Sequence, residues 1–267
     1  MKVVLFCGGA GMRLRGYSED VPKPMVTIGS RPVLWHVMKY YAHYGHKDFI
    51  ICLGYKGNAI KNFFLEYEES VSNDFVFSQG GRQLEFVQRD IDDWKITFVD
   101  TGLQSTIGDR LRLVEPYIDG DEIFLANYSD GLTNYPLPEL IEDFKQRESY
   151  VSFLSVQPRS SSLDTVQVGE DGSVQAIRCM KDSNIWVNGG YFVLRKDVFR
   201  YLKPGEEFVY QPMQRMIAEG KVRSFRYDGF WQCMDTFKDK QILDELEASG
   251  AAPWSVWKNH FIERVPA

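Results

Sequence analysis

The stretch MKVVLFCGGAGMRLRGYSEDVPKPMV (1–26) decides the fold class. Its apolar run at 2–7 predicts a buried strand, and this run breaks directly into glycines. Ligands of open α/β sheets bind beyond the carboxyl ends of the strands, so a glycine-rich loop here indicates a binding site. Backbone N–H groups of this loop, followed by Arg13 and Lys23, favour a bound phosphate. A plain tight turn remains the alternative.

The rest of the first half alternates strand and helix patterns. A helical pattern begins near Pro32 and ends at Gly45, and further ones follow. The apolar runs that predict buried strands are 48–53, 96–100 and 122–127. This order predicts an α/β fold with a mixed, mostly parallel sheet and helices on both faces.

The second half has shorter strands and more turns. Asp171-Gly172 predicts a hairpin, and a final helix stops at Gly250. The predicted strands are 150–156, 165–169, 173–180, 187–195 and 222–227. With no internal repeat or linker, we expect one domain over 1–267. Its halves are 1–135, for which the alternation predicts a nucleotide-binding sheet, and 136–267, which carries a small β-rich insertion and the C-terminal helix.

Composition excludes several classes of protein. The formal charge is −6 without a dense Lys/Arg tract, which argues against a nucleic-acid partner. No run approaches 18 apolar residues, so we expect no membrane association and a cytoplasmic location. The four cysteines lack C-x-x-C spacing and predict reduced thiols rather than a disulfide framework or zinc site.

Two aspartates occupy positions suited to a metal. Asp130 follows a predicted strand in YSDG (128–131), where a carboxylate can hold Mg²⁺ against a polyphosphate. Asp235 lies just before the last helix. Each has a simpler explanation, because Asp130 also suits a turn or helix N-cap and Asp235 a helix cap. Lys23 lies between Pro22 and Pro24, a stiff backbone that suits a fixed charge better than a helix or strand.

Three phosphate-binding classes fit poorly. The loop lacks the Lys-Ser/Thr of a P-loop NTPase. The second strand ends in Leu53-Gly54 rather than the acidic residue of dinucleotide-binding enzymes. Metal-dependent glycosyltransferases usually show D-x-D, whereas YSDG has one aspartate. Nucleotidyl transfer, with a nucleoside triphosphate, one metal and a phosphorylated acceptor, remains.

An ordered set of motifs from Met1 to about Trp257 supports this choice. The motifs are GGAGMRL, PKPMV, RPVLWHVMKYY, DFIICLGYKG, VDTG, YSDG, NGGYFVL, GFWQCMDT and APW. In order and spacing the chain resembles sugar-1-phosphate nucleotidyltransferases, most of all glucose-1-phosphate cytidylyltransferases. The resemblance implies a Rossmann-like fold and a Mg²⁺-dependent enzyme that joins CTP to a phosphorylated acceptor, releases pyrophosphate and gives a CDP-activated product. We also expect a homo-oligomer.

The resemblance also assigns residues. It gives Arg13 and Lys23 catalytic contacts to phosphate, and it makes Asp130 and Asp235 the metal ligands. The implied nucleotide-binding residues are Gly8, Gly9, Ala10, Gly11, Met12, Thr101, Ser105, Arg110 and Ser129. The implied acceptor-binding residues are Lys181, Asn188 and Gly189.

The resemblance makes 136–267 the acceptor-binding half, and this half departs from the family pattern. A family Glu-Lys-Pro is missing near IRCMKDS (177–183), where Lys181 supplies a lysine from a shifted position. Gln211 stands before Pro212 in place of an acidic residue. These changes leave three hypotheses: a different phosphorylated acceptor, glucose 1-phosphate after neutral drift, or a non-catalytic nucleotide-binding regulator. Retention of both basic residues and both aspartates argues against the regulator.

Overall fold

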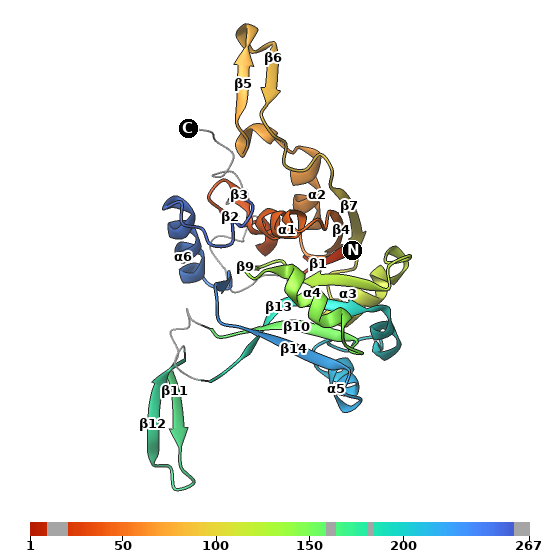
Figure 1. Cartoon of the computed structure of the whole chain (residues 1–267), viewed down its shortest axis with the longest axis vertical. Coiled ribbons are helices and arrows are strands. Elements are labelled where there is room, and N and C mark those ends of the chain that lie inside the picture. Colours follow the sequence, from red (N-terminus) through yellow and green to blue (C-terminus); the bar gives the residue numbers. More distant parts are fainter. Residues whose placement is uncertain (10–20, 159–163, 181–183, 259–267) are drawn as a thin grey trace.

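The computed structural model describes residues 1–9, 21–158, 164–180 and 184–258. Its centre is a seven-stranded sheet with the order β14-β10-β13-β8-β1-β4-β7 (Figure 1). Neighbours in this order pair in parallel, except that β13 is antiparallel to β10 and to β8. The bounds are β1 Lys2–Phe6, β4 Asp48–Leu53, β7 Lys95–Asp100, β8 Ile123–Asn127, β10 Val151–Val156, β13 Val187–Arg195 and β14 Val222–Tyr227. The predicted mixed, mostly parallel sheet is confirmed.

Strand β1 shows why the sheet carries helices on both faces. Successive side chains of a strand point to opposite faces. Val3 and Leu5 belong to one buried cluster, whereas Val4 and Phe6 belong to the other. Because both faces of β1 are apolar and almost fully buried, each face needs its own layer of helices.

The helices divide between these two layers. Buried residues of α1, α2, α4 and α6 join the cluster of Val3, and those of α3 and α5 join the cluster of Val4. The bounds are α1 Val33–His43, α2 Gly57–Leu65, α3 Ile107–Val114, α4 Leu137–Lys145, α5 Gln211–Ala218 and α6 Phe237–Ala248. The prediction of helices on both faces is confirmed.

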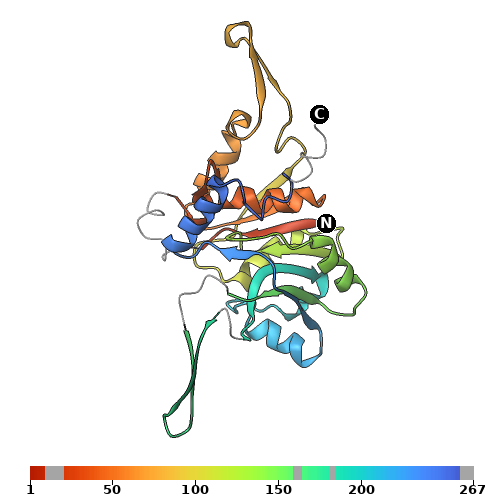
Figure 2. The same cartoon turned by 60° about the vertical axis from the view of Figure 1, so that its left-hand side comes forward.

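Two hairpin arms project from opposite ends of the body (Figures 1 and 2). The predicted hairpin at Asp171-Gly172 is confirmed as the turn between β11 (Asp164–Val168) and β12 (Val174–Cys179). The opposite arm, β5 (Phe75–Ser78) and β6 (Gln83–Phe86), is absent from the sequence-based prediction. Two further small sheets pair β2 with β3 and β9 with β15; their bounds are β2 Thr27–Ile28, β3 Arg31–Pro32, β9 Gly131–Thr133 and β15 Trp231–Cys233.

Helices of the described segments are all too short or too polar to cross a bilayer.

Candidate active site

Asp130 is held by a strained turn at the carboxyl end of β8. Ser129, just before it, has φ of 63°, in the left-handed region that residues with a side chain rarely adopt. The Ser129 hydroxyl donates to the Phe6 carbonyl oxygen at 2.9 Å, and the backbone N–H of Ser129 donates to Asn127 Oδ1 at 2.6 Å. These bonds fix the turn against the end of β1. Strand β9 follows Asp130, so Asp130 is not a helix cap.

Asp235 reaches the same place through the pairing of β9 with β15. Cys233 pairs with Gly131, and the Met234 N–H donates to the Asp130 carbonyl oxygen at 2.9 Å. The N-cap of α6 is Thr236, which forms a capping box with Asp239. Thr236, rather than Asp235, therefore caps this helix, and the Asp235 carboxylate contacts Lys23 instead.

Lys23 joins the two carboxylates. It opens a 3-10 turn, Lys23–Met25, with a proline on each side. Its ammonium donates to Asp130 Oδ2 at 2.6 Å and also to Asp235 Oδ1. Burial acts to lower the pKa of Lys23, but the charges of Asp130 and Asp235 and the hydrogen bonds to them outweigh burial and raise it. Burial raises the pKa of Asp130, and the ammonium acts in the opposite direction.

This pair of carboxylates fits a magnesium ion. Mg²⁺ is usually bound by one or two carboxylates together with waters and substrate phosphates, rather than by a full protein cage. Within the described segments, no group of three or more His, Cys, Asp or Glu side chains could hold a metal. The donors at this site, two converging carboxylates, match a metal that shares its coordination with a polyphosphate.

Beneath the site, Arg110 ties together the ends of three strands. Its guanidinium donates to the Leu53 carbonyl oxygen at 3.1 Å, to Thr101 Oγ1 at 2.5 Å and to the Gly8 carbonyl oxygen at 3.2 Å. Thr101 Oγ1 in turn donates to the Leu53 carbonyl oxygen at 2.7 Å. Arg110 and Thr101 are 3% and 2% exposed. Arg110 thus holds the backbone at Gly8. The contact of Arg110 and Thr101 with a nucleotide stays a prediction.

The other nucleotide-side residues are only partly described. Ser105 donates from its hydroxyl to the Thr101 carbonyl oxygen, and Gly9 is exposed beyond the end of β1. The predicted site residues that lie outside the described segments are Ala10, Gly11, Met12, Arg13 and Lys181. Their roles stay predictions.

Asn188 and Gly189 lie on β13, beside the turn that carries Asp130. Asn188 Nδ2 donates to the Tyr128 hydroxyl at 3.2 Å, and Asn188 Oδ1 accepts from the Gly190 N–H at 2.9 Å. The Gly189 carbonyl oxygen accepts from Trp231 Nε1 at 2.9 Å. The structure therefore places two of the three predicted acceptor residues in contact with Tyr128 and Trp231, which precede Asp130 and Asp235 by a few positions. Their contact with an acceptor is a prediction.

Sequence reasoning missed Trp231 as a member of this site. Its ring nitrogen lies 3.4 Å from the positions that a Cβ would take at Gly131 and at Gly189. The ring thus covers two glycines, one directly after Asp130 and one on the acceptor side. The available signal was an aromatic residue four positions before Asp235, within the GFWQCMDT motif.

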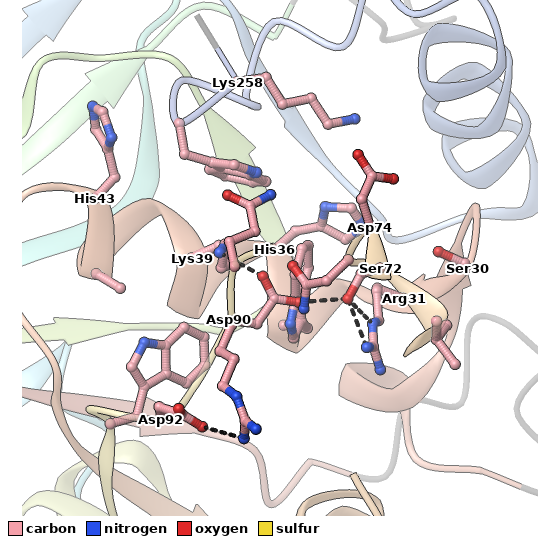
Figure 3. A pocket seen from close by; sticks show the side chains of 18 of the residues that line it. Ser30, Arg31, His36, Lys39, His43, Ser72, Asp74, Asp90, Asp92 and Lys258 are labelled. Atoms are coloured by element: carbon pink, nitrogen blue, oxygen red, sulfur yellow. Dashed lines mark hydrogen bonds and ion pairs between the residues drawn. The ribbon is translucent and has the colours of Figure 1, made fainter. Parts of the chain in front are cut away.

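A cavity of about 1160 Å³ lies elsewhere, between α1, the base of the β5–β6 arm and the chain near Trp257 (Figure 3). Two of its cationic side chains bond to protein groups: Arg31 donates to the Ser72 hydroxyl at 3.0 Å, and Lys39 to Asp90 at 2.8 Å. None of the predicted site residues within the described segments lines this cavity.

Comparison with known proteins identifies the family. The family model described as "Nucleotidyl transferase" matches residues 2–240. The chain belongs to this family. It is 37% identical over 261 residues, 97% of this chain and 100% of the relative, to a glucose-1-phosphate cytidylyltransferase of Salmonella typhi. It is also 37% identical over 259 residues, 96% of this chain and 100% of the relative, to a probable glucose-1-phosphate cytidylyltransferase of Bacillus subtilis.

Solved structures confirm the Rossmann-like nucleotidyltransferase fold. HddC from Yersinia pseudotuberculosis superposes with a TM-score of 0.68 at 20% identity, covering 91% of this chain and 98% of that protein. The inositol-1-phosphate CTP transferase from T. maritima gives a TM-score of 0.61 at 17% identity, covering 92% and 96% of the two chains. At such identities the likeness concerns the fold alone.

Proposed function

We propose that this nucleotidyltransferase transfers a cytidylyl group from CTP to a sugar 1-phosphate in a Mg²⁺-dependent reaction that releases pyrophosphate. One observation carries the proposal: Lys23, Asp130 and Asp235, from three distant parts of the chain, meet at the carboxyl edge of the sheet, where β8 pairs with β1. The names of the relatives at 37% identity support CTP as the nucleotide and a sugar 1-phosphate as the class of acceptor.

The chemistry follows from charge and position. A phosphate oxygen of the acceptor attacks the α-phosphorus of CTP in line, a P–O bond forms, and the bond to pyrophosphate breaks. Mg²⁺ held by Asp130 and Asp235 would neutralise phosphate charge. Lys23 would hold the reacting phosphates, and Arg13 would neutralise the departing pyrophosphate. Since the protein makes no covalent bond, positioning and electrostatic stabilisation supply the catalysis.

Asn188, Gly189 and Trp231 would bind the acceptor beside this centre. The amide and the carbonyl already form hydrogen bonds within the protein, which fixes their orientation. An aromatic ring beside the metal suits the apolar face of a pyranose. The altered residues of the acceptor half, including Gln211, favour an acceptor that differs from glucose 1-phosphate.

Pyrophosphate release with CTP tests the function and the acceptor together. We expect turnover with at least one sugar 1-phosphate or related phosphomonoester of a panel. We also expect a higher kcat/KM for CTP than for UTP, ATP or dTTP as the nucleotide substrate. A kcat/KM of about 10⁴ M⁻¹s⁻¹ or higher for glucose 1-phosphate would show that this sugar phosphate is an efficient acceptor, and it would contradict the proposal of a different one. Nucleotide binding without turnover of any acceptor would support the regulator hypothesis.

Asp130→Asn is the decisive variant. It keeps the size of the side chain and removes the charge that faces the metal, so kcat/KM should fall about a hundredfold or more. The matched control is Asp93→Asn, which neutralises an exposed aspartate paired with Lys47 far from the site and should leave turnover unchanged. Turnover of Asp130→Asn near the wild-type rate at saturating Mg²⁺ would reject the metal assignment.

We also propose that the chain works as a homo-oligomer in the cytoplasm. The two hairpin arms support self-association, because each exposes apolar side chains to solvent. The cytoplasmic location rests on the sequence pattern and on the biosynthetic character of the reaction.

A further inference from the structure

The contact of Lys23 with both aspartates has a consequence for metal binding. The Lys23 side chain is 14% exposed, and those of Asp130 and Asp235 are 26% and 38% exposed. Its Nζ lies within hydrogen-bonding distance of one oxygen of each carboxylate. The ammonium therefore lies between the two carboxylates rather than beside one of them.

A magnesium ion needs the same oxygens. Mg²⁺ binds carboxylate oxygens at about 2.0–2.1 Å in near-octahedral geometry, so an ion shared by Asp130 and Asp235 would lie in direct contact with both. An ammonium held by the same two side chains would then stand a few ångströms from a divalent cation. In a partly buried site this repulsion is weakly screened.

We propose that Lys23 and Mg²⁺ exclude each other from the carboxylate pair, so that Lys23 holds the pair until metal and nucleotide arrive together. The role of the pair as a metal site rests on the proposed function. Lys23 then leaves the carboxylates and contacts the phosphates of the nucleotide, which offer it new oxygen partners. One side chain thus serves first as counter-ion of the metal ligands and then as phosphate ligand.

The local structure suits this exchange. Pro22 and Pro24 stiffen the backbone on both sides of Lys23, so the main chain stays in place. The ammonium sits on a flexible four-carbon stem and can change partners by rotation about side-chain bonds alone. Because either the ammonium or the metal lies between the two carboxylates at each stage, their negative charges are never left unpaired in this partly buried site, where unpaired charges are costly.

Metal binding to the nucleotide-free protein tests the proposal without turnover. Mn²⁺, which substitutes for Mg²⁺ and is detected by electron paramagnetic resonance, is titrated into wild type and Lys23→Met. Removal of the ammonium should tighten Mn²⁺ binding at least tenfold, whereas kcat for nucleotidyl transfer should fall. Lys23→Arg, which keeps the charge, should bind Mn²⁺ as weakly as wild type.

Two controls place the effect at this site. Lys39→Met removes a comparable ammonium, 18% exposed and paired with Asp90, and should leave Mn²⁺ binding unchanged. Addition of Asp130→Asn to Lys23→Met should abolish the tightened binding.

Equal Mn²⁺ affinity of wild type and Lys23→Met would overturn the proposal, and so would tightened binding that survives Asp130→Asn. If Lys23→Met does not fold, Lys23→Gln replaces it, because its amide can still donate to the carboxylates but carries no charge. Lys23→Gln should also bind Mn²⁺ at least tenfold more tightly than wild type. Failure of the proposed function has a separate sign: wild type would bind Mn²⁺ with these affinities but release no pyrophosphate from CTP with any acceptor.

Discussion

Gly8 shows how little space surrounds the first residue of the phosphate loop that follows β1. A Cβ at this position would lie 1.9 Å from Arg110 Nη1, inside the guanidinium that bonds the ends of β1, β4 and β7. Arg110 is buried and bonded on several sides, so it cannot move without breaking those bonds. Gly8 is therefore required by packing, independently of its predicted contact with a phosphate.

Gly8→Ala should lower the free energy of unfolding by about 2–4 kcal/mol, because overpacking displaces a buried, hydrogen-bonded arginine. Gly9→Ala is the matched control, since a Cβ there meets no atom of the described residues within 4 Å. Urea denaturation of the two variants and wild type gives the comparison. Equal midpoints for Gly8→Ala and Gly9→Ala would show that Arg110 yields easily.

The residues of the site were predicted unevenly. Asp130 and Asp235 could be placed because each follows or precedes a recognisable element, and the carboxyl ends of parallel strands meet at one edge. The contact of Lys23 with both carboxylates could not, because it joins residues more than a hundred positions apart. The same limit applies to Arg110. Helical periodicity can place this residue on α3, but it cannot identify its three hydrogen-bond acceptors, which lie at or just beyond the ends of β1, β4 and β7.

At the scale of elements, His36 of α1 fastens the C-terminal segment to the body. Its buried ring donates from Nε2 to the Ile28 carbonyl oxygen at 3.1 Å and accepts at Nδ1 from Trp254 Nε1 at 3.2 Å (His36 labelled in Figure 3). Both bonds together require the neutral ring. Burial lowers the pKa of His36 to about 4; the charge of Glu247 on α6 opposes this shift, and that of Lys258 adds to it.

Acid should therefore loosen this contact. Between pH 6.5 and 4 the unfolded chain binds a proton at His36 and the folded chain does not, so stability falls as pH falls. The contribution is about 1.4 kcal/mol of unfolding free energy per pH unit in that window. Urea midpoints measured across it for wild type and His36→Gln should converge toward acid pH. Parallel curves would mean that the pKa of His36 does not differ between the folded and the unfolded chain.

The elements themselves differ in how well a sequence predicts them. The buried strands were predicted because a doubly covered strand is a short apolar run. The β5–β6 arm was missed: Phe75, Val76 and Phe77 are adjacent apolar residues, all partly exposed, and they follow neither the alternation of a half-buried strand nor the boundaries of a buried one.

At the scale of the whole molecule, the two arms extend the chain at both ends of its long axis (Figure 1). Isolated two-stranded hairpins are marginally stable in water. On β5, Phe77 is 64% exposed, and on the opposite arm Val174 and Ile177 are 60% and 65% exposed. Apolar side chains at two distant places suit contacts with further copies of the chain, which would stabilise both arms.

We therefore predict that the protein is an oligomer at micromolar concentration, with a mass in solution that is a multiple of 30.9 kDa. Phe77→Asp and Ile177→Asp each place a charge on one arm without touching the sheet, so each should lower the mass measured by light scattering after gel filtration. Leu113→Asp charges an exposed apolar residue of α3, 49% exposed, and should leave the mass unchanged. A wild-type protein that elutes as a monomer, or arm variants that keep the wild-type mass, would show that these apolar side chains do not mediate self-association.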